Sequence, residues 1–239
     1  MQSPAFSDER QQDVAAVRRA LDGVASFGTS IKLPLMTAAE LFTLGALGHP
    51  MVDAGALSWW NAHDDHETLA TMTYGYLARR KLLDPETGRV APALGLILAG
   101  RSRPAFILIS RNKPTADPSP LRVYGIAEEP GGVLAVLVEG AQAKHLAWAG
   151  PGYHYMLTGV ATESRSLAEI AAGGKHRTFD VYRPGSGSVL PSERIVVTRT
   201  RQGLRADRQA PSQPFPAQVD CDLDGLTGLL ASVMTGASQ

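Results

Sequence analysis

The sequence AFILIS, at residues 105–110, is where the chain changes from helical to strand patterning, and it decides the predicted fold. Pro104 precedes this run, and a loop with three prolines, residues 111–120, follows it. A short apolar run bounded by proline is typical of a buried strand, because proline cannot donate to the ladder of backbone hydrogen bonds. We therefore expect helices before this strand and mainly strands after it.

Three helices are predicted between residue 34 and AFILIS. Thr37 and Glu40 have the spacing of a capping box, in which each side chain accepts a hydrogen bond from the other residue's backbone amide. This first helix is expected to end at Gly48. A second helix is predicted over residues 64–82 and a short third one over residues 91–99, which has a proline in its first turn. The apolar stripe of the second helix is predicted to contain Leu69, Met72, Thr73, Tyr76 and Leu77.

Strands dominate the chain after AFILIS. Residues 121–127 and 133–138 are predicted to pair as a hairpin across the turn at residues 129–132. Helices followed by strands indicate an α+β fold, with an antiparallel or mixed central sheet flanked by helices, rather than alternating βαβ units. Further strands are predicted at residues 153–160, 177–182, 194–200 and 204–208, and helices at residues 167–172 and 223–234.

Two parts of the chain are distinguished as an arm and a domain. Residues 1–33 are predicted to form an N-terminal arm with one short amphipathic helix, residues 8–24. Residues 34–239 are predicted to form a single α+β domain. Its two halves, about residues 34–174 and 175–239, repeat the order of strands followed by a helix, which suggests a weak duplication.

Composition and charge narrow the class of protein. The chain has 239 residues, of which 44% are hydrophobic and 19% charged, as in ordinary globular proteins. Its 23 basic and 23 acidic residues give no net charge, whereas nucleic-acid binders usually carry a basic excess. Cys221 is the single cysteine, so no internal disulfide is possible. With no secretory signal and no long apolar run, we expect a cytoplasmic protein that does not insert into a membrane.

The densest group of potential metal ligands is NAHDDHE, at residues 61–67. One hypothesis is a metal-dependent hydrolase that uses His63 and His66, which share a face when they are three residues apart on a helix. The favoured interpretation is the start of a helix, in which Asn61 or Asp64 is the N-cap and the carboxylates lie at the positive end of the helix dipole. The histidines also lack the H-E-x-x-H spacing of zinc proteases.

Two loop regions are the candidate binding surface, because functional residues often lie on loops. One is the loop of residues 111–120, and the other is the aromatic region of residues 147–155. The aromatic side chains there could equally be buried in the core. The strands near the C-terminus are locally basic, which would suit an acidic partner. The predicted partner-binding residues are Arg111, Lys113, Trp148, Tyr153, Tyr155, Arg199 and Arg201.

The order of these features resembles that of the EspG family, the cytosolic chaperones of actinobacterial type VII (ESX) secretion. A capped helix ends at His49-Pro50, and a second helix leads into Leu82-Leu83-Asp84 and the turn ETGRV, residues 86–90. A short apolar helix and the strand AFILIS follow. Near the end, residues 195–216 (IVVTRTRQGLRADRQAPSQPFP) precede an apolar helix. The resemblance covers roughly residues 34–110 and 175–235, and this chain has a shorter middle and the added N-terminal arm.

The resemblance implies two sheet-and-helix halves related by a pseudo-twofold axis. It also implies a chaperone or adaptor that binds a helical secretion substrate, such as a PE–PPE-like pair, and keeps it soluble for export. Such a protein is expected to have no catalytic residues, metal or cofactor, and to be a monomer or homodimer when free. Besides the metal-dependent hydrolase, a winged-helix-like transcriptional regulator is the other alternative, because helices precede a hairpin.

Overall fold

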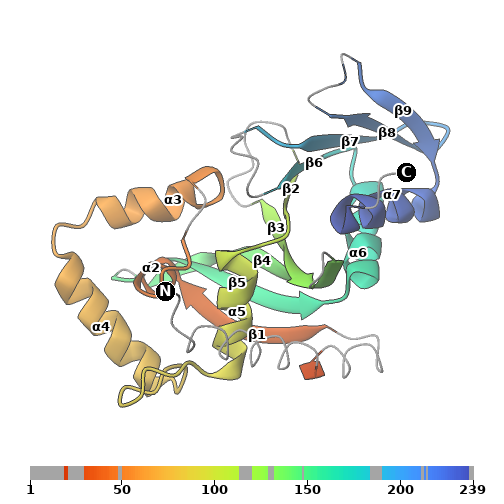
Figure 1. Ribbon diagram of the computed structural model, residues 1–239. Coiled ribbons are helices and arrows are strands. Elements are labelled where there is room, and N and C mark those ends of the chain that lie inside the picture. The colour runs from red at the N-terminus through yellow and green to blue at the C-terminus, as the bar shows by residue number, and fades with distance from the viewer. Residues whose placement is uncertain are drawn as a thin grey trace. The chain divides into compact units, whose positions relative to one another are not determined.

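A computed structural model describes residues 19–20, 30–47, 50–112, 120–128, 132–146, 148–183, 190–210, 213 and 215–236 (Figure 1). Within these residues it contains six helices and nine strands. The strands form one open antiparallel sheet in the order β1-β5-β4-β3-β2-β6-β7-β8-β9. The predicted α+β class is therefore confirmed, and the sheet is antiparallel rather than mixed.

The chain divides into two compact units that are each discontinuous in sequence. The first unit comprises Met1–Arg103 and Glu139–Leu157, and the second comprises Pro104–Val138 and Thr158–Gln239. The first unit contains β1 (Ile31–Thr37), α2 (Ala38–Thr43), α3 (Pro50–Asn61), α4 (His66–Arg79), α5 (Pro92–Ser102) and most of β5 (Gly150–Thr158). The second contains β2 (Ile107–Arg111), β3 (Leu121–Glu128), α6 (Val160–Gly173), β6 (His176–Tyr182), β7 (Glu193–Arg199), β8 (Leu204–Gln209), β9 (Ala217–Cys221) and α7 (Leu223–Thr235). The long strand β4 (Gly132–Leu146) contributes to both units.

The predicted capping box is present at the start of α2. The Thr37 hydroxyl accepts a hydrogen bond of 3.3 Å from the Glu40 amide, and the Glu40 carboxylate accepts one of 2.7 Å from the Thr37 amide. Glu40 is fully buried, and it also receives a hydrogen bond from the Arg80 guanidinium at the end of α4. Because Arg80 also donates to the Leu35 carbonyl at 2.6 Å, it ties α4 to β1 and α2.

The helices of the first unit differ from the prediction mainly at their boundaries. The first predicted helix was expected to reach Gly48, but α2 ends at Thr43. A separate helix, α3, begins at Pro50 and was not predicted. Proline has no amide hydrogen to lose at the first position of a helix, so it suits the start of α3 as well as the end of an earlier helix. In α5, Pro92 is the first residue, as expected.

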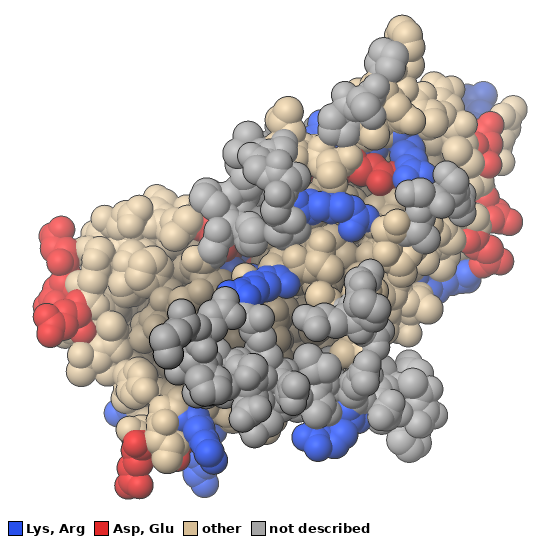
Figure 2. Space-filling model, in the orientation of Figure 1, with Lys and Arg blue, Asp and Glu red and all other residues tan. Residues whose placement is uncertain are grey.

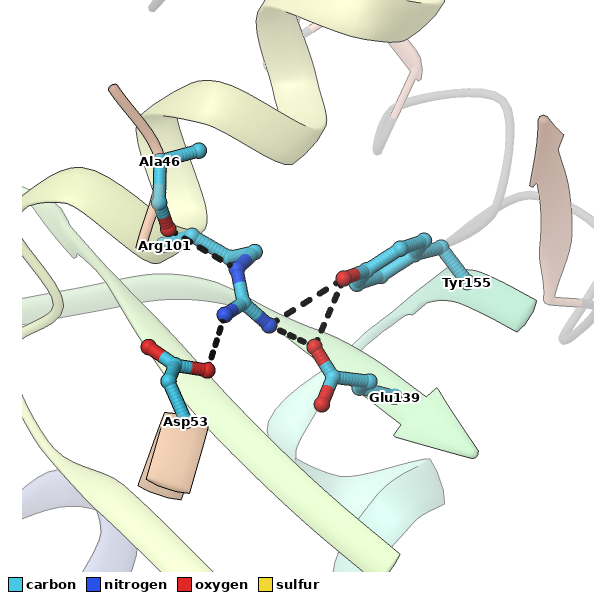
Figure 3. Close-up of polar contacts among 5 residues, drawn as sticks. All are labelled: Ala46, Asp53, Arg101, Glu139 and Tyr155. Atoms are coloured by element: carbon cyan, nitrogen blue, oxygen red, sulfur yellow. Dashed lines mark hydrogen bonds and ion pairs between the residues drawn. The ribbon is translucent and has the colours of Figure 1, made fainter. Parts of the chain in front are cut away.

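A buried arginine connects several elements of the first unit (Figure 3). Arg101, in α5, binds Asp53 of α3 at 2.5 Å and also binds Glu139 of β4. The Tyr155 hydroxyl donates to Glu139 at 2.6 Å, and the Arg101 Nε donates to the Ala46 carbonyl at 3.1 Å. We call these five residues the arginine network. It fixes α3 and α5 against β4 and β5 through polar contacts that are closed to solvent.

AFILIS forms the core of the second unit. Its strand, β2, pairs antiparallel with β3 on one side and β6 on the other. The side chains of residues 106–109 are each at most 1% exposed, as expected for a central strand. The Phe106 ring lies directly over Gly125 of β3, where a Cβ atom would be 2.4 Å from the ring. Glycine is therefore required at this position of β3.

Asp180, in β6, is a buried charge of the second unit that is paired with cations. Its carboxylate binds Arg111 of β2 and Arg194 of β7, the latter at 2.5 Å. We call these three residues the aspartate cluster. Because β2, β6 and β7 are neighbours in the sheet, the cluster joins three strands through their side chains.

The two helices of the second unit are longer than predicted or capped differently. Helix α6 begins at Val160, after its N-cap Gly159, and so starts seven residues before the helix predicted over residues 167–172. Helix α7 has the predicted position, and its N-cap is Asp222, which accepts a hydrogen bond of 2.8 Å from the Gly225 amide. The proline-rich segment before α7 continues into β9, a strand that was not predicted.

No helix among the described residues is long and apolar enough to span a membrane. Several predictions fall outside the part of the chain that the structure describes. These are most of the N-terminal arm, most of the loop at residues 111–120, and the turn at residues 129–131. Of the helix predicted for residues 8–24, only Arg19 and Ala20 are described, and both are helical.

Candidate functional site

The first unit contains an aromatic groove beside α4. Its volume is about 530 Å³, and we call it the α4 groove. Met72 is about half exposed there, so the groove presents apolar surface to solvent. The lining residues are Thr71, Met72, Gly75, Tyr76, Arg79 and Trp148.

The pattern of α4 explains why this groove is open. Leu69, Thr73 and Leu77 recur every four residues and are buried, so they form the inner face of the helix. Met72 and Tyr76 were predicted to share that stripe, but they lie one residue round the helix and line the groove instead. The helix therefore has apolar side chains on a second, solvent-facing side.

Aromatic contacts hold the two walls of the groove. The rings of Tyr76 and Trp148 meet edge to face, with centroids 5.6 Å apart. The guanidinium groups of Arg79 and Arg80 lie 6.0 and 5.4 Å from the Tyr76 ring centroid, within the range of cation–π attraction. Both walls are thus fixed before any ligand arrives, which reduces the entropy lost on binding.

Gly75 lines the α4 groove and leaves open space between its neighbours on the helix, which we call the notch. A Cβ atom placed on Gly75 would meet no atom within 4 Å, so nothing in the described structure fills this space. Glycine inside a helix costs about 1 kcal/mol relative to alanine. Glycine at residue 75 therefore lowers the stability of α4, although the packing around it leaves room for a larger side chain.

Trp148 is positioned by an unusual backbone segment. Its neighbour Ala149 is buried, and the Ala149 carbonyl accepts a hydrogen bond of 3.1 Å from the Ala39 amide of α2. Gly150 has a φ of 73°, and a Cβ atom there would be 2.5 Å from the Trp59 ring. Only glycine suits both the backbone angle and the space. Trp148 thus sits on a segment that is anchored against the first unit's aromatic core.

The residues of NAHDDHE form the junction between α3 and α4. Contacts with the same aromatic core hold the two histidines of this segment in place. The Trp60 ring stacks on Phe42 at 3.7 Å and on the His66 ring at 4.7 Å. His63 donates to the Trp59 carbonyl at 2.8 Å, and His66 donates to the Trp60 carbonyl at 3.0 Å. These carbonyls lie in the last turn of α3 and also accept hydrogen bonds from the Ala62 and His63 amides, so each histidine side chain adds a second bond to an acceptor at the helix end.

The N-cap of α4 is Asp65, and not Asn61 or Asp64 as predicted. Its carboxylate accepts a hydrogen bond of 2.9 Å from the Thr68 amide, and this bond lowers the pKa of Asp65. Figure 2 shows acidic side chains where α3 runs into α4, and few charges along the two helices. Among the described residues, no three His, Cys, Asp or Glu side chains converge as a metal site would need.

A second groove, of about 700 Å³, lies in the second unit, and we call it the β7–β8 groove. It brings together Arg199 and Arg201, two of the predicted partner-binding residues, with Cys221. Arg199 donates to the Ala172 carbonyl at the end of α6, at 3.2 Å. Burial, with smaller contributions from Asp222 and Asp220, raises the pKa of the Cys221 thiol. The thiol is therefore a poor nucleophile at neutral pH.

Of the other predicted binding residues, the three that the structure describes do not line these grooves. Tyr153 and Tyr155 are buried, and Tyr155 belongs to the arginine network. Arg111 is bound to Asp180 in the aspartate cluster. Lys113 lies outside the described residues. Of the seven, Trp148 alone lines the α4 groove, and only Arg199 and Arg201 are brought together in one groove.

The α4 groove was largely missed from the sequence, although Gly75 was a usable signal. An isolated glycine within a helical pattern usually has a packing or functional reason. Comparison with known proteins gives no further guide to function: no protein-family model matches the sequence, and no curated protein is significantly similar to it. The residues of the two grooves are therefore the best guide to function.

Proposed function

We propose that the protein binds a helical protein partner in the α4 groove and acts as a chaperone or adaptor rather than as an enzyme. The observation that carries this proposal is the open notch at Gly75, bordered by Met72, Tyr76 and Trp148. Aromatic and arginine side chains dominate the binding energy of protein interfaces. An apolar side chain of a partner helix inserted at the notch would be enclosed on both sides.

The resemblance to the EspG family makes the proposal more specific. In this form, the partner is a PE–PPE-like helical pair that is kept soluble before type VII export. The end of α4 is basic, since Arg79 and Lys81 are both exposed. This charge favours a partner with acidic residues beside the apolar side chain that enters the notch.

Filling the notch tests the proposal. A Gly75→Leu variant should bind at least tenfold more weakly, because leucine occupies the space that the partner needs. The measurement is isothermal titration with a PE–PPE-like pair encoded near the gene, preceded by size-exclusion chromatography of the co-expressed proteins. The α4 helix should tolerate the change, since the added Cβ contacts nothing within 4 Å.

Gly55→Leu is the matched control. Gly55 lies in α3 of the same unit and also has no atom within 4 Å of a placed Cβ, but it does not line the groove. This variant should bind as the wild type does. Equal affinity of Gly75→Leu and wild type would exclude the α4 groove as the binding site. If no PE–PPE-like pair binds the wild type, the proposed role in type VII secretion is wrong.

A further inference from the structure

The two edge strands of the sheet are protected very differently. On β1, Pro34 removes a backbone donor, Lys32 adds an exposed charge, and the pairing with β5 is irregular between Leu33 and Met36. Proline, lysine and bulges are the common means by which a sheet edge is kept from pairing with another chain. None of these three features occurs within β9, whose sequence is AQVDC.

Strand β9 leaves apolar surface open at its edge. Val219 is 45% exposed, although Ala206, its partner in β8, is fully buried. Phe215, two residues before the strand, is 81% exposed. The four residues from Ala217 to Asp220 are all exposed, although each is paired with β8 on the other side. The outer side of β9 thus combines backbone groups that pair with no other described strand with exposed apolar side chains.

We propose that β9 pairs antiparallel with β9 of a second copy of this chain, with Val219 on the twofold axis. The sequence AQVDC is self-complementary in this arrangement. Val219 lies opposite its own copy, Gln218 lies opposite Asp220, and Ala217 lies opposite Cys221. All five residues of the strand are then paired, and the two sheets become continuous.

Charge and register select this arrangement over its neighbours. Facing residues of a continuous sheet must point to the same face, so a symmetric pair must be centred on a residue. The three centres that pair more than one residue of β9 with its copy are Gln218, Val219 and Asp220. A centre at Asp220 places two carboxylates directly opposite each other, which is destabilising. A centre at Gln218 leaves Cys221 unpaired and faces Asp220 with Pro216. Only the Val219 centre gives Asp220 a donor, the Gln218 amide, while Arg205 remains its neighbour in β8.

The same register keeps the two native thiols apart. Cys221 of one copy and Cys221 of the other are four residues apart along the strands, about 13 Å at the usual rise per residue. A disulfide requires Cα atoms less than about 7 Å apart. The proposed dimer is therefore non-covalent, even under oxidising conditions. This inference concerns the second unit alone and does not depend on the α4 groove.

Sedimentation equilibrium of the purified full-length protein is the first test. The wild type should show a reversible monomer–dimer equilibrium. Val219→Lys, which places two cations on the twofold axis, should weaken the dimer at least tenfold. Ile170→Lys is the control, because it also adds a lysine at an exposed apolar position of the second unit but outside β9, and it should dimerise normally. A wild type that stays monomeric at all concentrations overturns the proposal, as does a dimer that Val219→Lys leaves intact.

Cysteine cross-linking tests the register even if Val219→Lys fails to fold. In a Cys221→Ser background, Val219→Cys should form an intermolecular disulfide on mild oxidation. Gln218→Cys in the same background should not, because the two new thiols would lie diagonally across the pair. Cross-linking at residue 218 that equals or exceeds that at residue 219 overturns the proposed pairing. So does the absence of cross-linking at residue 219.

Discussion

The two units each bury one charged side chain among groups of the opposite sign, but the signs are inverted. In the arginine network, a cation lies between two anions, and Arg101, Asp53 and Glu139 are all at most 3% exposed. In the aspartate cluster, an anion lies between two cations. Asp180 is 1% exposed there, but Arg111 and Arg194 are 22% and 44% exposed.

The difference shows that the stability lost on removing a buried charge depends on whether its partners can reach water. Removing one member of a dry network leaves the others as uncompensated buried charges, which is strongly destabilising. A partly exposed arginine can instead direct its head group to water while its stem stays packed. We therefore expect the first unit to be much more sensitive than the second to the loss of its central charge.

Arg101→Met should produce the largest loss of stability. It leaves Asp53 and Glu139 buried without their cation, and we expect the free energy of unfolding to fall by about 3–5 kcal/mol. Chemical denaturation followed by circular dichroism measures the change. A triple variant, Arg101→Met with Asp53→Asn and Glu139→Gln, should recover at least half of the loss because it removes all three charges. An Arg101→Met variant as stable as the wild type would contradict the comparison.

Glu163, on the buried face of α6, is a carboxyl group whose pKa is raised by burial alone, to about 7. A carboxyl group whose pKa is raised by folding favours the folded state at low pH. This contribution is full below the unfolded value of about 4.5 and is lost as the pH rises through about 7. Glu163→Gln should therefore be more stable than the wild type by about 3 kcal/mol at pH 8, but not at pH 4.

The measurement for Glu163 is the unfolding midpoint of both proteins from pH 4 to pH 8. Glu169→Gln is the control, since Glu169 lies on the same helix but is more than half exposed. The control should change stability by less than about 1 kcal/mol across this range. A pH-independent difference between Glu163→Gln and the wild type would show that the Glu163 carboxyl does not titrate differently on folding.

Asp180→Asn should give the smallest of the three effects, a loss of about 2 kcal/mol in the free energy of unfolding. The amide keeps the shape of the side chain, and both arginine head groups can reach water. Arg194→Ala in the same cluster should cost still less, about 0–1 kcal/mol, because Arg111 remains bound to Asp180. If Asp180→Asn lowers the free energy of unfolding as much as Arg101→Met does, the exposure of the partners does not control the loss of stability.

Local signals in the sequence were enough to predict much of the fold. AFILIS lies in a central strand because its five consecutive apolar residues need cover on both faces of the sheet. The capping box at Thr37 and the first-turn proline at Pro92 also formed as expected, since each depends only on residues within one helical turn. Strands β1 and β9 were missed, because Pro34 in one and the prolines before the other masked short edge strands.

The candidate site depends on contacts that no local pattern contains. The helix α3 was missed because Pro50 suggests the end of a helix as readily as the start of one. Without α3, the histidines of NAHDDHE had no carbonyl groups to bind, and their pairing with Trp59 and Trp60 could not be foreseen. The α4 groove likewise needs Trp148, which lies more than sixty residues from α4 in sequence.

Gly150 gives the protein a route by which buried changes can alter the binding that we propose for the α4 groove. It lies beneath the Trp59 ring and two residues after Trp148, so any side chain added there displaces one tryptophan or the other. Partner recognition could then be lost or retuned by a substitution that never touches the partner. A survey of binding variants should therefore find effects at residue 150 and in its packing neighbours, as well as along the exposed wall of α4.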